Sequence, residues 1–375
     1  MARHIFERSS RAAANAVAVA AMASMLAACG GAGDYASSPA ARGTRYSATI
    51  LIADTAQTSG TSRTDAMLVD PWDLAVSGQA AVWVTNKGSS SSTLYDETDG
   101  ARQLRVGAPV GSTASARPTG VAFNSGNGFE VTQDGRTGTA RFIVASEGGT
   151  LSGWAPALGL DTAIVAFDGS AAGAVYTGLV KTTVQGVDGI LLAADFHNRV
   201  VDAFGTDFKK LPGADRFVDP ELPAGYAPFG IRAEGERVHV AYAKQDAQAR
   251  APQVGAGLGL INIFDSAGHL LQRLIRVGDV LNAPWGMAIA PANFGAFGGA
   301  LLVANTGDGT IHAFDAATGR LLGALTRADG AVLVIDGLHR IAFGNGAAGL
   351  PTDALFFAAG PDGGRHGIYG RVDPE

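Results

Sequence analysis

The sequence has a single cysteine in its 375 residues, and only 17% of its residues are charged. One thiol excludes a disulfide framework within the chain and any zinc site built from paired cysteines. Basic residues are also scarce, because 28 lysines and arginines stand against 34 aspartates and glutamates. Without a basic excess we expect no nucleic-acid partner. The sequence also lacks the His-Glu-x-x-His and Gly-x-Ser-x-Gly motifs, so neither a zinc protease nor a serine hydrolase is predicted.

The N-terminus is typical of a targeting segment. Residues 3–11 are basic, and residues 12–28 form an apolar run that ends in small side chains. The stretch Leu26-Ala-Ala-Cys29 resembles a bacterial lipobox, which implies a lipoprotein signal peptide over 1–28 and lipidation of Cys29. Ordinary secretion is the alternative. A small, polar stretch over 29–45 is predicted to be a flexible tether.

This reading places the protein outside the cytoplasm. A lipid on Cys29 would anchor the chain to a membrane without spanning it, so we expect an exported, cell-envelope protein. Gly30 follows the cysteine where inner-membrane lipoproteins often carry Asp. In a Gram-negative cell, that residue favours the outer membrane, with the protein facing the periplasm.

Residues 46–375 repeat one pattern of short strands and turns. Proline and glycine signals at Pro71, Pro118, Pro228 and Pro284 recur at one or two multiples of about fifty residues, a period typical of propellers. Each signal begins a strand, and further apolar strands follow it, separated by Gly, Asn and Asp turns. The sequence therefore predicts an all-β fold, a six-bladed β-propeller with four-stranded antiparallel blades.

The two ends of this region are predicted to share a blade. The last blade runs out of chain at about its third strand, while residues 46–52 form a strand with no blade of their own. We expect this N-terminal strand to complete the last blade. Closing the ring removes a free strand edge, so we expect a monomer.

Several segments resemble a bacterial family of exported proteins that has no assigned activity and is known by a numbered family name. They include Asp70-Pro-Trp, Ala241-Tyr-Ala-Lys-Gln-Asp and Leu281-Asn-Ala-Pro-Trp-Gly. The family is broadly similar to NHL-type propellers. The resemblance implies the fold and an exported setting, and it supplies no reaction. The chain departs from this pattern at Asp73, Thr306 and residues 339–340, where the family would have Gly, Phe and Trp-Gly.

Candidate site residues come from two sets of loops. In a propeller, the loops that enter the inner strands and those that join second to third strands lie on one face, near the channel mouth. The ligand-binding candidates on these loops are Asp70, Trp72, Glu147, Asp195, His197, Tyr226, Lys244, Asp246, Trp285, Asn305, Asp336 and His366.

Two functions remain open for this face. Acids, amides and aromatic rings suit a small polar ligand or a hard cation such as Ca²⁺. The favoured hypothesis is a lipid-anchored binding or scaffold protein for a small polar ligand or a cell-envelope partner. The alternative is a metal-assisted, lactonase-like hydrolase with a central cation. His197, His339 and His366 could hold zinc if the ring brought them together, and Asp308 is more typical of a hairpin turn than of a calcium loop. No residue is assigned a catalytic role.

Overall fold

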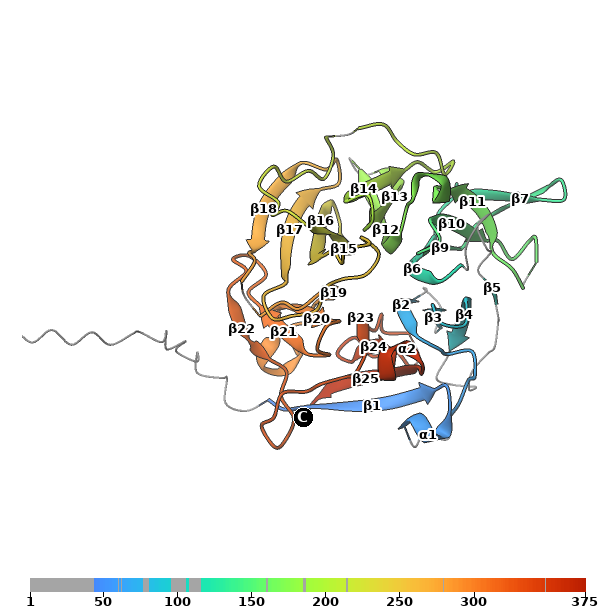
Figure 1. The fold of residues 1–375 in the computed structure, drawn as a ribbon. Helices are drawn as coiled ribbons and strands as arrows, with labels where there is room; N and C mark the ends of the chain where they lie inside the picture. Colours follow the sequence, from blue (N-terminus) through green and yellow to red (C-terminus); the bar gives the residue numbers. More distant parts are fainter. Residues whose placement is uncertain are drawn as a thin grey trace, which may run out of the picture. The chain divides into compact units, whose positions relative to one another are not determined.

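A computed structural model describes residues 44–59, 61, 63–76, 81–95, 106–107, 116–159, 161–184, 187–213, 215–278, 280–347 and 349–375. The predicted signal peptide, Cys29 and nearly all of the predicted tether lie outside these residues. The described part forms six antiparallel sheets arranged radially around a central axis (Figure 1). This arrangement confirms the predicted all-β, six-bladed propeller.

The first three blades follow the chain in order. Blade one contains β2 (Pro71–Val76), β3 (Val82–Asn86), β4 (Ser91–Tyr95) and β5 (Val106–Gly107). Blade two contains β6 (Pro118–Phe123), β9 (Phe142–Ser146), β10 (Thr150–Trp154) and β11 (Ile164–Asp168), and η1 (Ser170–Ala172) follows it. Blade three contains β12 (Tyr176–Val184), β13 (Val187–Asp195) and β14 (Val200–Phe204).

The remaining blades complete the ring. Blade four contains β15 (Tyr226–Glu234), β16 (Arg237–Lys244), β17 (Gly259–Asp265) and β18 (Leu270–Ile275). Blade five contains β19 (Pro284–Ile289), β20 (Leu301–Asn305), β21 (Ile311–Phe314) and β22 (Leu321–Ala324), with η2 (Gly295–Phe297) after β19. Blade six contains β23 (Leu338–Phe343), β24 (Leu355–Ala359), β25 (Ile368–Pro374) and β1 (Tyr46–Ala53), with short helices α1 (Ala56–Ser59) and α2 (Pro361–Gly364).

The first and last strands close the ring as predicted. β1 runs antiparallel to β25, with Tyr46 opposite Pro374 and Ala53 opposite Ile368. The Tyr46 ring is 1% exposed and packs on Phe294 with 5.1 Å between ring centroids. Its hydroxyl donates a hydrogen bond to the Phe294 carbonyl at 3.2 Å. The N-terminal strand is therefore anchored to blade five as well as paired within blade six.

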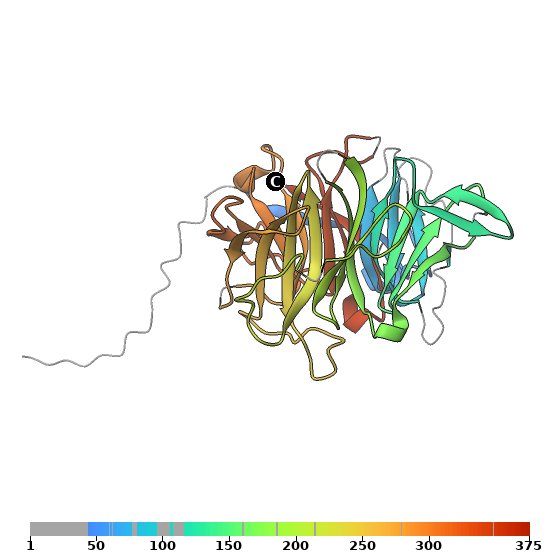
Figure 2. The ribbon, with the colours of Figure 1, turned by 90° about the horizontal axis from the view of Figure 1, so that it is seen from above.

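Two features differ from the regular pattern. Blade three has three strands within the described residues, and an isolated bridge between Phe204 and Lys210 extends its outer edge. An additional hairpin, β7 (Glu130–Gln133) and β8 (Arg136–Thr139), is inserted between β6 and β9 and extends beyond the ring (Figures 1 and 2). Its turn is Asp134-Gly135, and both residues have positive φ, as a type I′ hairpin turn requires.

Glycines allow the inner strands to approach one another at the axis. Gly120, Gly178, Gly230 and Gly286 occupy equivalent positions in blades two to five. A Cβ atom on Gly230 would lie 2.2 Å from the Trp285 carbonyl oxygen of the next blade. The strands can therefore cross this closely only where the side chain is absent.

Loops from every blade gather at one end of the ring, which we call the α2 face. It carries the segments that enter the inner strands and those that join second to third strands, including η1 and α2 (Figure 2). All twelve predicted ligand-binding residues lie in or next to these segments. Among the described residues, no helix is long and apolar enough to cross a membrane.

Candidate functional site

Six side chains fill the axis just below the α2 face, and we call them the axial plug. Each side chain belongs to a residue that lies at a shift in strand register near the start of its inner strand. Such a β-bulge changes the direction in which a side chain points. None is more than 5% exposed. The six residues are Trp72, Thr119, Thr177, Phe229, Trp285 and His339.

The plug is held together by hydrogen bonds and ring contacts. The indole N–H groups of Trp72 and Trp285 both donate to the Thr177 carbonyl, at 3.2 and 2.8 Å. Trp72 meets Phe229 and Trp285 edge to face and stacks on His339 with 3.9 Å between centroids. Burial, with Lys87 nearby, holds the pKa of His339 well below its usual value, so this imidazole is neutral at pH 7. Trp72 and Trp285 thus close the channel, and their rings are covered by protein.

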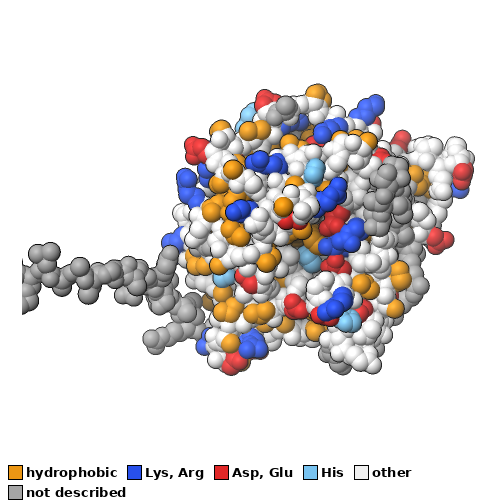
Figure 3. Space-filling model, viewed as in Figure 1, with side chains coloured by type: hydrophobic (Ala, Val, Ile, Leu, Met, Phe, Trp, Pro, Cys, Tyr) orange, Lys and Arg blue, Asp and Glu red, His pale blue; other side chains and the backbone are white. Residues whose placement is uncertain are grey.

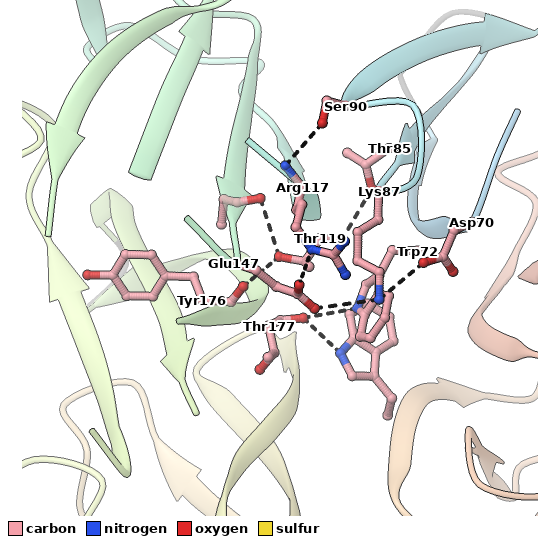
Figure 4. Close-up of polar contacts among 12 residues, drawn as sticks. Asp70, Trp72, Thr85, Lys87, Ser90, Arg117, Thr119, Glu147, Tyr176 and Thr177 are labelled. Carbon is pink, nitrogen blue, oxygen red and sulfur yellow. Dashed lines mark hydrogen bonds and ion pairs between the residues drawn. The ribbon is translucent and has the colours of Figure 1, made fainter. Parts of the chain in front are cut away.

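Four charged side chains, the charged cluster, lie over the plug on the α2 face (Figure 4). The Lys87 Nζ lies 3.8 Å from the centroid of the Trp72 ring. It also lies 3.1 Å from Asp70 Oδ2 and 3.5 Å from Glu147 Oε1. Arg117 Nε donates to Glu147 Oε2 at 2.6 Å. Figure 3 shows basic and acidic side chains side by side near the middle of this face.

The cluster repeats one backbone arrangement in two blades with the charges exchanged. Asp70 and Arg117 each precede an inner-strand proline and have φ of 48° and 43°. Lys87 and Glu147 each follow a second strand and donate a backbone N–H to the carbonyl of Asp70 or Arg117, at 2.9 and 3.1 Å. Blade one therefore supplies acid then base, blade two supplies base then acid, and the Lys87–Glu147 contact links the blades.

Neighbouring groups favour the charged form of Arg117. Burial opposes the charge on Arg117, but Glu147, with Asp70 farther away, outweighs it and raises the Arg117 pKa. Asp70 is enclosed by the α2 segment of blade six, because a Cβ on Gly360 would lie 2.4 Å from Asp70 Oδ1. Lys87, which contacts both acids, is absent from the predicted residues. Its position matches that of Glu147, and this equivalence is the sequence signal that could have identified it.

Several other predicted residues stabilise their own turns. Asp195 Oδ1 accepts hydrogen bonds from the N–H groups of Val175 and Asn198, at 3.1 and 3.2 Å. Asn305 Oδ1 accepts from the Asn282 N–H at 3.1 Å. Asp246 Oδ1 accepts from the Arg250 N–H at 2.8 Å, and Asp336 Oδ2 accepts from the Asp362 N–H at 2.9 Å. These groups satisfy backbone donors in the loops of the α2 face.

The remaining predicted residues do not join the charged cluster. His366 Nδ1 lies 2.7 Å from Asp54 Oδ2 in blade six, and His197 Nδ1 lies 3.2 Å from the Ala249 carbonyl. Tyr226 is buried, and Lys244 is partly exposed at the end of β16. Across the described ranges, no three acidic, histidine or cysteine side chains come together as a possible metal site. The metal-assisted alternative therefore gains no centre from these residues.

A buried ion pair lies on the other side of the plug. Arg340 Nε lies 3.3 Å from Asp73 Oδ1, and Asp73 Oδ2 accepts the Val121 N–H at 2.9 Å. Burial raises the pKa of Asp73 to about 6, with Arg340 acting in the opposite direction. Both residues stand where four other blades have the crossing glycines. Two of the departures noted in the sequence, Asp73 and Arg340, thus form one ion pair between adjacent blades.

Solved structures similar to this chain have diverse functions. A streptogramin B lyase is 11% identical, with a TM-score of 0.44 and coverage of 90% of this chain and 100% of the lyase. A glucose dehydrogenase is 12% identical, with a TM-score of 0.48 and coverage of 81% and 96%. Identities and scores this low transfer no activity, and the fold assignment rests on the strand order of the chain itself.

The relatives described here are viral proteins. No protein-family model matches the chain. "Uncharacterized protein R648" of Acanthamoeba polyphaga mimivirus is 31% identical over 325 residues, which cover 84% of this chain and 78% of the relative. "Uncharacterized protein L690" of the same virus is 31% identical over 317 residues, with coverage of 82% and 81%.

These relatives correct the predicted membership of a bacterial family. The motifs behind that prediction are turns such as Asp70-Pro71 and Ala283-Pro284, where positive φ before a proline serves propeller geometry. Such turns recur because several blades use one to begin the inner strand. They therefore indicate the propeller fold and do not identify the organism or family. The chain belongs to the family of the mimivirus proteins R648 and L690.

Proposed function

We propose that this protein is a non-enzymatic binding propeller that receives a small polar ligand on its α2 face. The observation that supports this most is the charged cluster, in which Lys87 bridges Asp70 and Glu147 above a closed aromatic plug. These side chains extend from strand ends and are held by mutual contacts. Because these side chains are already ordered, a ligand that binds here loses little binding free energy to ordering the site.

The exposed parts of the cluster suggest the class of ligand. The Arg117 side chain is 46% exposed, and Glu147 is 18% exposed. Arg117 uses Nε for Glu147, and the rest of its guanidinium can donate hydrogen bonds to an acceptor. A matching ligand offers an anionic or strongly accepting group to Arg117 and a cationic or donating group to Glu147. Amino acids and amino sugars have this combination.

The cellular setting belongs to the same proposal. The protein is exported, and a lipid on Cys29 holds it at the surface of a membrane, as the N-terminal sequence predicts. In the full-length protein, Cys29→Ser should move the chain from the membrane fraction to the soluble fraction. Membrane association that persists unchanged in this variant would contradict the lipid anchor.

A thermal-shift screen of the full-length protein tests the ligand site. The compounds are amino acids, amino sugars and uncharged sugars, because a ligand that binds the native state raises the melting temperature. We expect an amino acid or amino sugar, which carries both kinds of group, to stabilise the wild type and Asp329→Asn, and to lose at least about tenfold in affinity for Glu147→Gln. Asp329 is the control because it pairs with Arg327 in an exposed contact outside the cluster.

Two results would contradict the proposed site. The first is that no compound in the screen stabilises the wild type. The second is that a stabilising compound binds Glu147→Gln as tightly as the wild type.

A further inference from the structure

The channel continues beyond the plug as a cavity of about 300 Å³, which we call the axial chamber. Its walls come from the later residues of the inner strands β2, β6, β12, β15 and β23. Those strands run from the α2 face toward the opposite end, so the chamber lies across the plug from the charged cluster. It is a separate site from the one proposed above.

Three cationic residues line the chamber. They are Lys181 on β12, Arg232 on β15 and Arg340 on β23, and they come from three different blades. The side chains of Arg232 and Arg340 are only 18% and 21% exposed. Positive charges brought together in a partly enclosed space repel one another, and an anion between them would relieve that repulsion.

The acidic partners of the two arginines lie at the ends of the chamber. Asp73 pairs with Arg340 on the plug side and is almost completely buried. Glu234 Oε2 lies 3.0 Å from Arg232 Nη1, and its side chain is 53% exposed to solvent. Burial lowers the pKa of Arg232, and Arg340 lowers it further although Glu234 opposes the change. The two guanidinium groups therefore interact unfavourably despite their acidic partners.

The rest of the lining is apolar. Val76, Phe123 and Phe343 contribute to the walls beside the three cations. The chamber is at the lower end of the volume range that encloses small organic ligands. A bare inorganic ion would leave these apolar walls without a partner.

We propose that the axial chamber binds a small organic anion, with its phosphate or carboxylate head on Lys181, Arg232 and Arg340 and its apolar part against Val76, Phe123 and Phe343. Arginine suits such a head because its planar guanidinium can donate two parallel hydrogen bonds to it. No covalent step is involved.

Calorimetric titration of the full-length protein at low ionic strength tests this site. The probes are phenyl phosphate, benzoate, inorganic phosphate and uncharged phenol. We expect one equivalent of phenyl phosphate or benzoate to bind, more tightly than inorganic phosphate, with no binding of phenol. Whichever organic anion binds more tightly identifies the preferred head group, phosphate or carboxylate.

Matched variants locate the binding. Lys181→Gln and Arg232→Gln should each weaken binding about tenfold or more, because each removes a charged hydrogen-bond donor. Lys209→Gln removes the same charge from a side chain that is 82% exposed in blade three, and it should bind like the wild type. Glu147→Gln should also bind like the wild type, which separates this test from that of the α2 face.

The proposal fails if neither organic anion binds, if phenol or inorganic phosphate binds as tightly, or if Lys181→Gln retains wild-type affinity. Circular dichroism establishes whether each variant is folded. If Arg232→Gln does not fold, Lys181→Gln decides the outcome, because the Lys181 side chain lines both this chamber and an adjacent cavity.

Discussion

Tyr46→Ala should lower the free energy of unfolding by about 3 to 5 kcal/mol, the usual cost of truncating a fully buried aromatic side chain. Tyr46 is 1% exposed and packs on Phe294 and Phe297 at centroid distances of 5.1 and 6.0 Å. Its loss leaves a cavity between β1 and blade five, at the strand that closes the ring. Denaturant unfolding followed by tryptophan fluorescence measures the change.

Tyr46→Phe is the matched control. It keeps the ring and removes only the hydroxyl that donates to the Phe294 carbonyl, so it should cost about 1 kcal/mol. A loss below about 1 kcal/mol for Tyr46→Ala would contradict the anchoring role of this side chain.

Gly230→Ala should lower the free energy of unfolding by about 3 to 4 kcal/mol. This cost is at or above the upper end of the usual range for adding atoms to a well-packed core. The added Cβ would lie 2.2 Å from the carbonyl oxygen of Trp285 and 2.8 Å from its Cα. These are backbone atoms of the neighbouring inner strand, so no side-chain rotation can relieve the overlap. The same unfolding experiment measures the effect.

Gly178→Ala is the control at the equivalent position in blade three. There the added Cβ would approach Ile231 Cγ2 at 3.3 Å and the Phe229 carbonyl oxygen at 3.4 Å. We expect this change to cost less than about 1 kcal/mol, because a small shift accommodates it. Equal losses of unfolding free energy in the two variants would contradict the prediction that the cost depends on how close the neighbouring strand lies to each glycine.

Local sequence was sufficient to predict most of the fold. The prolines at 71, 118, 228 and 284 mark inner strands because they fall where the chain turns into a blade. The surplus strand at 46–52 and the incomplete last blade predicted their pairing. Both inferences use information carried by short segments, which is why they succeeded.

Departures from the repeat were harder to foresee. The hairpin β7–β8 has a strong local signal in Asp134-Gly135, but its strands fit no blade of the repeat. Within the described residues, blade three has only three strands, and the segment after Phe204 adds a single bridge at Lys210. Whether a segment adds to a sheet depends on the packing of its neighbours, and no residue pattern in the segment itself determined that outcome.

The candidate site was predicted only in part. The shared face followed from propeller topology, but several polar side chains on it serve nearby backbone groups, as Asp195 and Asn305 do. Turn-forming acids and ligand-binding acids look alike in sequence, because both follow strands and both are hydrogen-bond acceptors. The pairs Lys87–Glu147 and Asp73–Arg340 join different blades, so they emerge only once the ring brings those blades together.

The pairing of β1 with β25 also has a consequence for how the chain acquires its structure. β1 is synthesised before every other strand that the structure describes, yet its partner, β25, is the last of those strands. Contacts between such distant segments form slowly, because a very long loop must close before they are gained. Until then β1 carries an unpaired edge that other chains could join. Completion of the sixth sheet is therefore the step at which folding and aggregation compete most directly.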